Sequence, residues 1–140
     1  MFWNKVKPAV NLVECNPFFQ REEERAYMES KDIQMQAWSP LSAGQANLFR
    51  NETLCAIAEN HQKTAAQVAL RWLTQRGIVP IVKSANPRRM KENLSIFDFA
   101  LTEDEMRQIA VLDTGHTCFS PRQTGSAVEE FLEKSLLYQL

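Results

Sequence analysis

The residues best suited to chemistry in this sequence lie where an apolar run meets the start of a helix. Lys83 and Ser84 follow the β-branched run 78–82, and Asn86 is placed to cap the next helix. A helix start offers unpaired backbone N–H groups and partial positive charge to an anion. Arg88 and Arg89 add two cations in the first turn, where cations are otherwise unfavourable, which suggests that an anion meets them there. The pattern favours a phosphate site, although a solvated basic helix start beside a buried strand would use the same residues.

A second candidate site lies at the end of another predicted strand. Apolar and polar residues alternate over the range 33–38, which is typical of a strand, and Trp38 and Ser39 stand where it ends. Proteins of the α/β class bind ligands at the carboxyl ends of their strands. Trp38 is therefore either an aromatic residue that contacts a ligand or a core side chain at the rim of the sheet, and the pattern alone favours neither.

Other reactive side chains are interpreted as structural. Cys15, Cys55 and Cys118 are widely spaced and form no CxxC motif or Cys/His cluster, which argues against a zinc site and fits reduced thiols in the cytoplasm. The acidic run 22–24 belongs to an amphipathic helix predicted over 20–31, and we interpret it as a solvated helix face rather than a metal site. His61 is expected to end a helix, where hydrogen bonds to the last carbonyl groups suit it.

Composition limits the classes of protein to which the chain can belong. Its 140 residues, 44% hydrophobic and 24% charged, suit one globular domain with its own core. A net charge of −1 gives no reason to expect nucleic acid or an anionic membrane as a partner. No apolar run has membrane-spanning length, and the first residues lack the apolar core of a signal peptide. We expect a single partial domain over residues 1–140, located in the cytoplasm, with a turn-rich tail over 116–140.

Strands and helices are predicted to alternate along the chain. The expected strands are 10–13, 33–38 and 78–82, and the expected helices are 20–31, 51–61, a helix between Thr64 and Gly77, 86–93, a helix between Thr102 and Gly115, and 128–137. The run 78–82 is expected to be buried on both faces. This order is typical of an α/β fold with parallel strands and right-handed crossovers, and three strands are few for a complete sheet.

Three stretches of the sequence together resemble the C-terminal half of the aldo-keto reductases. They are NLVECNPFFQ, IQMQAWSPLS and the long stretch from KTAAQVALRW through KSANPRRMKEN to ALTEDEM, and the resemblance covers residues 8–113 in order. It implies a (β/α)8 TIM barrel, of which this chain would form the C-terminal portion, with about three parallel strands and flanking helices. It also implies NADPH as the cofactor and the reduction of small-molecule aldehydes and ketones by hydride transfer.

The resemblance assigns a cofactor-binding role to eight residues. These are Trp38 stacked on the nicotinamide ring, Ser39 and Leu41 along the pyrophosphate, Lys83, Ser84 and Arg89 at the 2′-phosphate, and Glu92 and Asn93 facing the adenine. The assignment agrees with the phosphate site that the residues themselves favour at Lys83 and Arg89.

Two departures from the family pattern affect the expected activity. Leu12 stands where the family usually carries a glutamine that reaches the nicotinamide carboxamide, and a leucine cannot form that hydrogen bond. The catalytic Asp, Tyr, Lys and His of the family belong to the first half of the barrel, before the matched region. The tyrosine and histidine residues of this chain match none of those positions, and we therefore expect no catalytic residue here.

Three functions remain open at this point. The chain is a piece of an NADPH-dependent oxidoreductase that carries the cofactor-binding half and is inactive alone, or a nucleotide-binding module without catalysis, or a half-barrel that works by pairing with another chain. Cutting a barrel leaves two unpaired strand edges, which are expected here at 10–13 and 78–82. Such edges favour a homo-oligomer.

Overall fold

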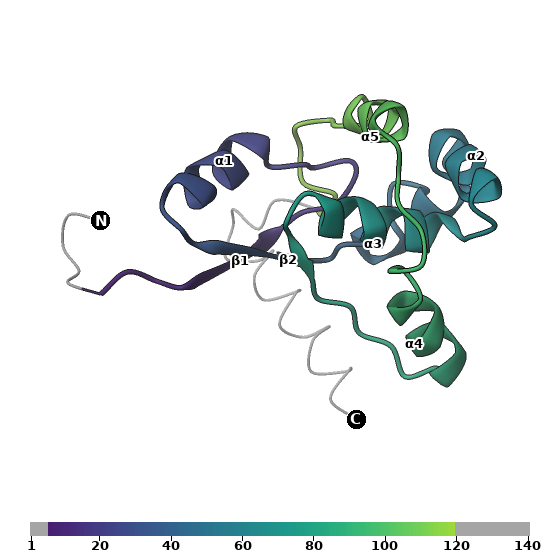
Figure 1. The fold of residues 1–140 in the computed structure, drawn as a ribbon, viewed down its shortest axis with the longest axis horizontal. Coiled ribbons are helices and arrows are strands. Elements are labelled where there is room, and N and C mark those ends of the chain that lie inside the picture. Colours follow the sequence, from purple (N-terminus) through teal and green to yellow (C-terminus); the bar gives the residue numbers. More distant parts are fainter. Residues whose placement is uncertain (1–5, 120–140) are drawn as a thin grey trace, which may run out of the picture.

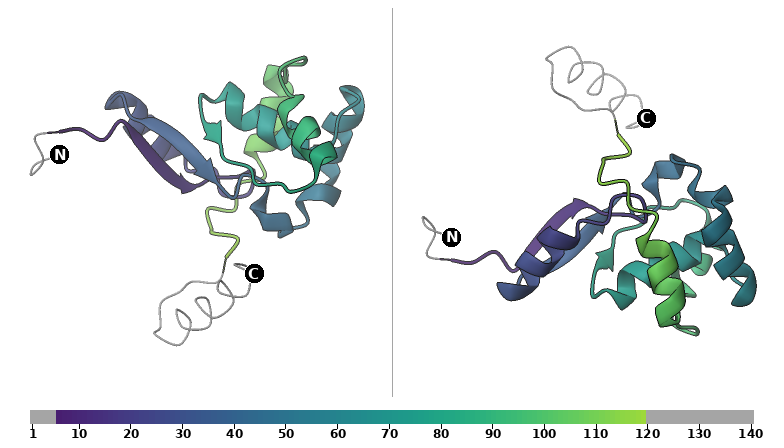
Figure 2. Two further views of the ribbon diagram at one scale, coloured as in Figure 1. Left: turned by 90° about the horizontal axis from the view of Figure 1, so that it is seen from below. Right: turned by 90° about the horizontal axis from the view of Figure 1, so that it is seen from above.

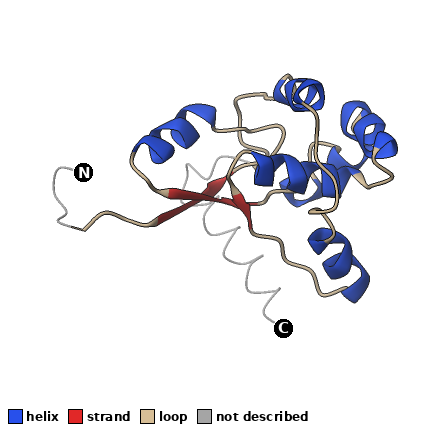
Figure 3. Ribbon diagram, viewed as in Figure 1, coloured by secondary structure: helices blue, strands red, loops and turns tan. Residues whose placement is uncertain are grey.

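The structure is a computed structural model and describes residues 6–119. Strands and helices alternate as the sequence predicts (Figure 1, Figure 3). In chain order the elements are β1 (Val10–Glu14), α1 (Glu22–Ser30), β2 (Gln34–Trp38), two 3-10 turns (Ser42–Gly44 and Leu48–Arg50), α2 (Glu52–Asn60), α3 (Ala65–Gln75), β3 (Val79–Pro80), α4 (Pro87–Leu94) and α5 (Glu103–Ala110). The helix predicted at 128–137 and most of the tail predicted over 116–140 lie outside the described residues.

The three strands form a parallel sheet in the order β1–β2–β3, so β1 and β3 are its two edges, as expected. Val10 pairs with Gln34 and Glu14 pairs with Trp38, which fixes the register of β1 against β2. β3 is shorter than the strand predicted over 78–82, with two residues in the ladder. Ile81 N still donates to Ala37 O at 2.9 Å, so the contact with β2 continues one residue past Pro80, which itself supplies no backbone N–H.

The expectation that the run 78–82 is buried on both faces is wrong. Ile78 is buried, but Val79 and Ile81 are 42% and 48% exposed. Side chains alternate between the two faces of a strand, so Val79 and Ile81 belong to the face opposite Ile78. Val10 and Leu12 are exposed on this same face of the sheet, and we call the four apolar residues the open face.

The other face of the sheet carries the core. Met35 and Ala37 of β2 are buried there. α1 packs against β2 and α3 packs against β3, and Figure 1 shows both helices on one side of the sheet. α3 is the central helix, with Val68, Trp72 and Leu73 buried, and α2 packs on its outer side. In the two turned views of Figure 2, the strands and the group of helices α2–α5 lie side by side.

The helices begin at the capping residues that the sequence predicts, but the predicted hydrogen-bond partner of His61 is wrong. Asn51 caps α2 by accepting a backbone hydrogen bond at 3.1 Å, and Thr64 and Thr102 form complete capping boxes. His61 is the C-cap of α2, but its side chain bonds Glu105 of α5 at 2.9 Å rather than the carbonyl groups of α2. A carboxylate is a stronger acceptor than a carbonyl group, which explains the difference.

The loop after β1 is tied to the end of α5. Gln20 Nε2 donates to Ile109 O at 2.8 Å, across a separation of 89 residues. Thr114 N donates to Phe18 O at 2.9 Å. The loop that follows β1 is therefore bonded to the end of α5. The residues after α5 consequently start close to the carboxyl end of β1.

Candidate functional site

A cavity of about 860 Å³ brings together seven of the eight residues that the resemblance assigns to the cofactor. They are Ser39, Leu41, Lys83, Ser84, Arg89, Glu92 and Asn93. The cavity lies between the segment after β2, the segment after β3, and α4. Because β2 and β3 are parallel, their carboxyl ends lie side by side at the same end of the sheet. The segments that follow the two strands therefore start next to each other.

The start of α4 gives the cavity its positive charge. Among residues 6–119, no ion pair involves Lys83 or Arg89, whereas Arg88 pairs with Glu92 at 2.9 Å. The free N–H groups expected at this helix start are absent, because Asn86 Oδ1 accepts from the backbone N–H of Arg88 at 2.9 Å and of Arg89 at 3.4 Å. An anion in the cavity would therefore meet the side chains of Lys83 and Arg89 and the helix dipole rather than bare amides.

Gln67 of α3 holds α4 in place. Its Nε2 donates to Glu92 O at 3.1 Å and to Ser95 O at 2.9 Å, two carbonyl groups at the end of α4. Its Oε1 accepts from Thr64 N at 3.0 Å and completes the capping box of α3. Gln67 is buried, so one side chain fixes both the start of α3 and the end of the helix that carries Arg89. The sequence predicts the capping box but contains no signal for the contacts with α4.

The segment after β2 follows a strained path. Five non-glycine residues between positions 39 and 47 have positive φ, from 50° to 54°, a region that such residues rarely adopt. The hydroxyl of Ser39 is buried and has no hydrogen-bond partner among residues 6–119. Strained backbone and unpaired buried polar groups concentrate at ligand sites. The segment is therefore a candidate to contact a polar ligand.

Trp38 is not among the residues that line the cavity. It lies at the end of β2, one residue before Ser39, and is 37% exposed. The ring of Phe119 packs against it, with ring centroids 5.3 Å apart and planes tilted by 45°. Trp38 is thus a partly exposed aromatic side chain at the rim of the sheet, beside the cavity.

The sequence interpretation missed part of the cavity wall. Phe49 lines the cavity and is 51% exposed, and it comes from a 3-10 turn that no sequence signal marked. Gly44 has φ of 75°, a backbone conformation that favours glycine, whereas a Cβ atom there would make only an ordinary contact of 3.5 Å with the ring of Phe49. In the sequence, the position of Gly44 in a loop after a predicted strand is the one feature that could have indicated this part of the wall.

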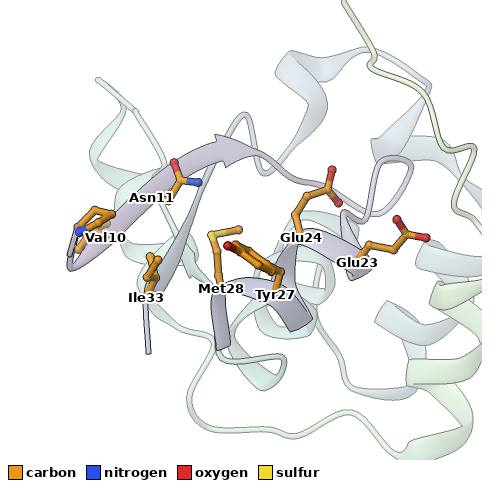
Figure 4. Close-up of a pocket in the computed structure, with 8 residues that line it drawn as sticks. Val10, Asn11, Glu23, Glu24, Tyr27, Met28 and Ile33 are labelled. Atoms are coloured by element: carbon orange, nitrogen blue, oxygen red, sulfur yellow. The ribbon is translucent and has the colours of Figure 1, made fainter. Parts of the chain in front are cut away.

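A second hollow, of about 580 Å³, runs along the free edge of β1 (Figure 4). Its apolar residues include Val10, Met28 and Ile33, and the carboxylates of Glu23 and Glu24 lie toward one end. None of its lining residues within the described part of the chain is cationic, so the hollow does not suit a phosphate. Within residues 6–119 no strand pairs with this edge of β1, and such an edge suits another segment of protein.

Two reactive side chains of the described chain, Tyr27 and Cys15, do not line the cavity. Tyr27 is 58% exposed on α1 and lines the hollow beside β1 instead. Cys15 is buried, and this burial raises the pKa of its thiol to about 11, which makes it a poor nucleophile. Residues 6–119 contain no group of three His, Cys, Asp or Glu side chains that could hold a metal ion, and no helix long and apolar enough to cross a membrane.

Comparison with known proteins identifies relatives of the chain. Residues 3–114 match the profile of the Aldo/keto reductase family. The 9,11-endoperoxide prostaglandin H2 reductase of Trypanosoma cruzi (strain CL Brener) is 46% identical over 110 residues, which are 78% of this chain and 39% of that protein. An aldo-keto reductase enzyme from a Medee basin deep-sea metagenome library has a similar solved structure, with a TM-score of 0.81 and 39% identity over 86% of this chain and 44% of that chain. Bombyx mori aldo-keto reductase in complex with NADP gives a TM-score of 0.78 at 32% identity, over 86% of this chain and 42% of that chain.

These matches place the sheet and helices within a larger fold. The chain spans about two fifths of the length of the relatives that it matches. Its three parallel strands and flanking helices are the C-terminal portion of a (β/α)8 barrel, as the resemblance implied. With a family profile that covers most of its length and neighbours that share both sequence and fold, the chain belongs to the aldo/keto reductase family.

Proposed function

We propose that the chain carries the NADPH-binding side of an aldo/keto reductase site. Lys83 and Arg89 would hold the 2′-phosphate, the segment 39–44 would follow the pyrophosphate, and Trp38 would stack on the nicotinamide. When bound, NADPH supplies a hydride to a carbonyl compound, and the residues of this chain bind and orient the cofactor. The Bombyx mori relative was solved with NADP, which supports the class of cofactor.

The chemistry of the cavity wall carries the proposal. It combines two cations without ion-pair partners among residues 6–119, Lys83 and Arg89, with a buried hydroxyl at Ser39 that also lacks a partner there. Two cations at a helix start suit a dianionic phosphate, and the Ser39 hydroxyl can donate to a phosphate oxygen. These residues therefore fit a phosphorylated dinucleotide better than an uncharged ligand.

The proposal predicts that the chain binds NADPH more tightly than NADH, because NADH lacks the 2′-phosphate. Arg89→Ala should weaken NADPH binding by about 1.5–3 kcal/mol, the range for a hydrogen bond to a charged group, and leave NADH binding unchanged. Lys91→Ala is the matched control, since Lys91 is exposed on the same helix and does not line the cavity. Isothermal titration calorimetry with each cofactor measures these affinities.

Two results would contradict the cofactor assignment. One is equal affinity of the wild-type chain for NADPH and NADH. The other is an equal loss of NADPH affinity in the Arg89→Ala and Lys91→Ala variants, which would indicate a diffuse effect of net charge rather than a phosphate contact.

We further expect that the 140-residue chain does not reduce carbonyl compounds by itself. General acid–base groups contribute about 10²–10⁴-fold each, and Tyr27, the tyrosine among the described residues, lies at the hollow beside β1 rather than at the cavity. Leu12 also lacks a hydrogen-bonding group for the nicotinamide carboxamide. NADPH oxidation in the presence of a reactive aldehyde is the assay, and turnover that disappears with Tyr27→Phe would overturn this expectation.

Assembly with another chain is a second candidate function, and the open face supports it. Val10, Leu12, Val79 and Ile81 are 42–50% exposed, which is unusual for a set of apolar side chains on one side of a sheet. The hollow beside β1 adds an apolar surface at the strand edge. A second copy of the chain would cover these surfaces without requiring any bound nucleotide.

A further inference from the structure

The segment after α5 is fastened to the end of β1. Thr117 Oγ1 donates to Glu14 Oε2 at 2.5 Å, and Cys118 N donates to Glu14 Oε1 at 3.1 Å. We call these two bonds the Glu14 clasp. Glu14 is buried, so its carboxylate is satisfied by this segment of the chain rather than by bulk water.

The Glu14 clasp sets Phe119 on Trp38. Glu14 and Trp38 are register partners in β1 and β2, so their side chains stand next to each other on the same face of the sheet. The residue after Cys118 therefore reaches Trp38, and the separation of 5.3 Å between ring centroids is that of a favourable aromatic pair. Phe119 remains partly exposed, which distinguishes this contact from packing in the core.

We infer that Phe119 competes with the nicotinamide ring of a bound dinucleotide for Trp38, an inference that rests on the proposed function. A dinucleotide held by its 2′-phosphate at Lys83 and Arg89 would run along the cavity to Ser39, the neighbour of Trp38. Trp38 offers a partly exposed ring there, and Phe119 already packs against it.

This competition acts on one half of the cofactor. Phe119 lowers the affinity for the nicotinamide half, because its ring must leave Trp38 before another ring can stack there. The adenine half meets Lys83 and Arg89 at the start of α4 and is unaffected. Glu14 acts through Phe119 and is a positioning residue.

The test compares two ligands that share the adenine half, NADPH and 2′,5′-ADP, on the full 140-residue chain. Phe119→Ala should tighten NADPH binding about two- to twelvefold, the range that an aromatic pair supplies, and leave 2′,5′-ADP binding unchanged. Phe97→Ala is the matched control, because Phe97 is 65% exposed and does not line the cavity, and it should change neither affinity. Isothermal titration calorimetry gives the affinities, and circular dichroism checks that the variants fold alike.

Glu14→Gln tests the clasp separately. A glutamine keeps one acceptor oxygen for Cys118 N but removes the charge that strengthens the bond from Thr117. The substitution should tighten NADPH binding by less than Phe119→Ala does, and should add nothing when Phe119 is already alanine. This non-additivity separates the positioning of Phe119 from a general effect on stability.

Each contrary outcome has its own meaning. Unchanged or weaker NADPH binding in Phe119→Ala, with 2′,5′-ADP still bound, would overturn the competition and leave the proposed function standing. Failure of 2′,5′-ADP to bind the wild-type chain would overturn the proposed site and the competition with it. Fully additive effects of Glu14→Gln and Phe119→Ala would overturn the positioning role of Glu14.

Discussion

Arg76 connects parts of the chain that lie far apart in sequence. Its guanidinium group donates to Gln20 O at 3.0 Å and to Glu22 Oε2 at 2.6 Å, and it lies 4.2 Å from the centre of the Trp72 ring. Hydrogen bonds from Arg25, and also from Arg76, outweigh partial desolvation and lower the pKa of Glu22 to about 2. Arg76 thereby joins the end of α3 to the start of α1.

At the scale of this residue, Arg76→Ala should lower the free energy of unfolding by about 1.5–3 kcal/mol, since it removes the charged donor to Gln20 O, one of the two arginines that bond Glu22, and the guanidinium group over the Trp72 ring. Arg107→Ala is the control, because the Arg107 side chain is 68% exposed and pairs with carboxylates of its own helix. Its effect should stay within about 0.5 kcal/mol. Urea unfolding measures both, and equal changes in the two variants would contradict the bridging role of Arg76.

At the scale of the elements, one pair of side chains joins the end of α2 to the start of α5. His61 Nε2 donates to Glu105 Oε1 at 2.9 Å, and Glu105 also accepts from Thr102 N at 2.8 Å in the capping box. Burial acts to raise the pKa of Glu105, but the hydrogen bonds from His61 and Thr102 outweigh it and lower that pKa. The ionised carboxylate therefore stabilises the folded chain.

The sign of this pKa shift predicts how stability depends on pH. A lowered pKa contributes stability that is present above the ordinary value of 4.5 and is lost as the pH falls through the folded value. Glu105→Gln keeps the capping box, which accepts glutamine, but removes the titration. The variant should unfold about 1 kcal/mol more easily at pH 7 and lose less stability than the wild type on acidification below pH 4.5.

A control on the same helix separates this effect from the helix dipole. Glu103 lies in the first turn of α5 with its side chain 94% exposed, so Glu103→Gln removes a similar dipole interaction without touching His61. Chemical unfolding at a series of pH values compares the three proteins. Identical pH dependence in the wild type and Glu105→Gln would show that the pair with His61 contributes nothing to stability.

The helix starts could be predicted because capping acts over very short distances in sequence. Asn51, Thr64 and Thr102 each accept a hydrogen bond from a backbone N–H three positions further on, so the signal and its partner appear in the same stretch. The burial of the run 78–82 could not be predicted in the same way, because it depends on what covers the two faces of the sheet. Its composition cannot reveal that one face lacks a cover among residues 6–119.

In the candidate site, too, the features encoded by neighbouring residues could be predicted and the contacts between distant residues could not. Lys83 and Arg89 could be predicted from the sequence because a strand end, a cap and three cations, with Arg88 as the third, lie within seven residues. The contact of Gln67 with Ser95 spans 28 positions, and that of Glu14 with Thr117 spans 103. No local pattern encodes such pairs, since they exist only after the strands and helices have packed.

At the scale of the whole molecule, the open face and the two strand edges predict self-association. Burying the apolar side chains of the open face against a second copy would remove them from water. We expect a dimer or higher oligomer at micromolar concentration in sedimentation equilibrium. Leu12→Lys should shift the chain toward the monomer, because it places a charge in the middle of the open face.

The matched control for this prediction is Val111→Lys. Val111 is 84% exposed just after α5 and does not belong to the open face, so the same change of charge there should leave the oligomer intact. A compact wild-type monomer with a cooperative unfolding transition would show that the half-barrel covers its own edges, and the prediction would be wrong.

The Glu14 clasp has a consequence for the order in which the molecule forms and opens. Its bond between Glu14 and Thr117 closes a loop of 103 residues, nearly the whole described chain. Closing such a loop costs roughly 2 kcal/mol more in conformational entropy than closing a loop of about ten residues. The bonds of Gln20 with Ile109 and of Thr114 with Phe18 close loops of 89 and 96 residues, so nearly all of this entropy is already lost when the end of α5 docks on the loop after β1. The clasp then closes only the short segment beyond Thr114, and it can open without separating α5 from that loop. Access to Trp38 then requires only the local release of the residues that follow Thr114, and it should increase with temperature well before the core of α3 loosens.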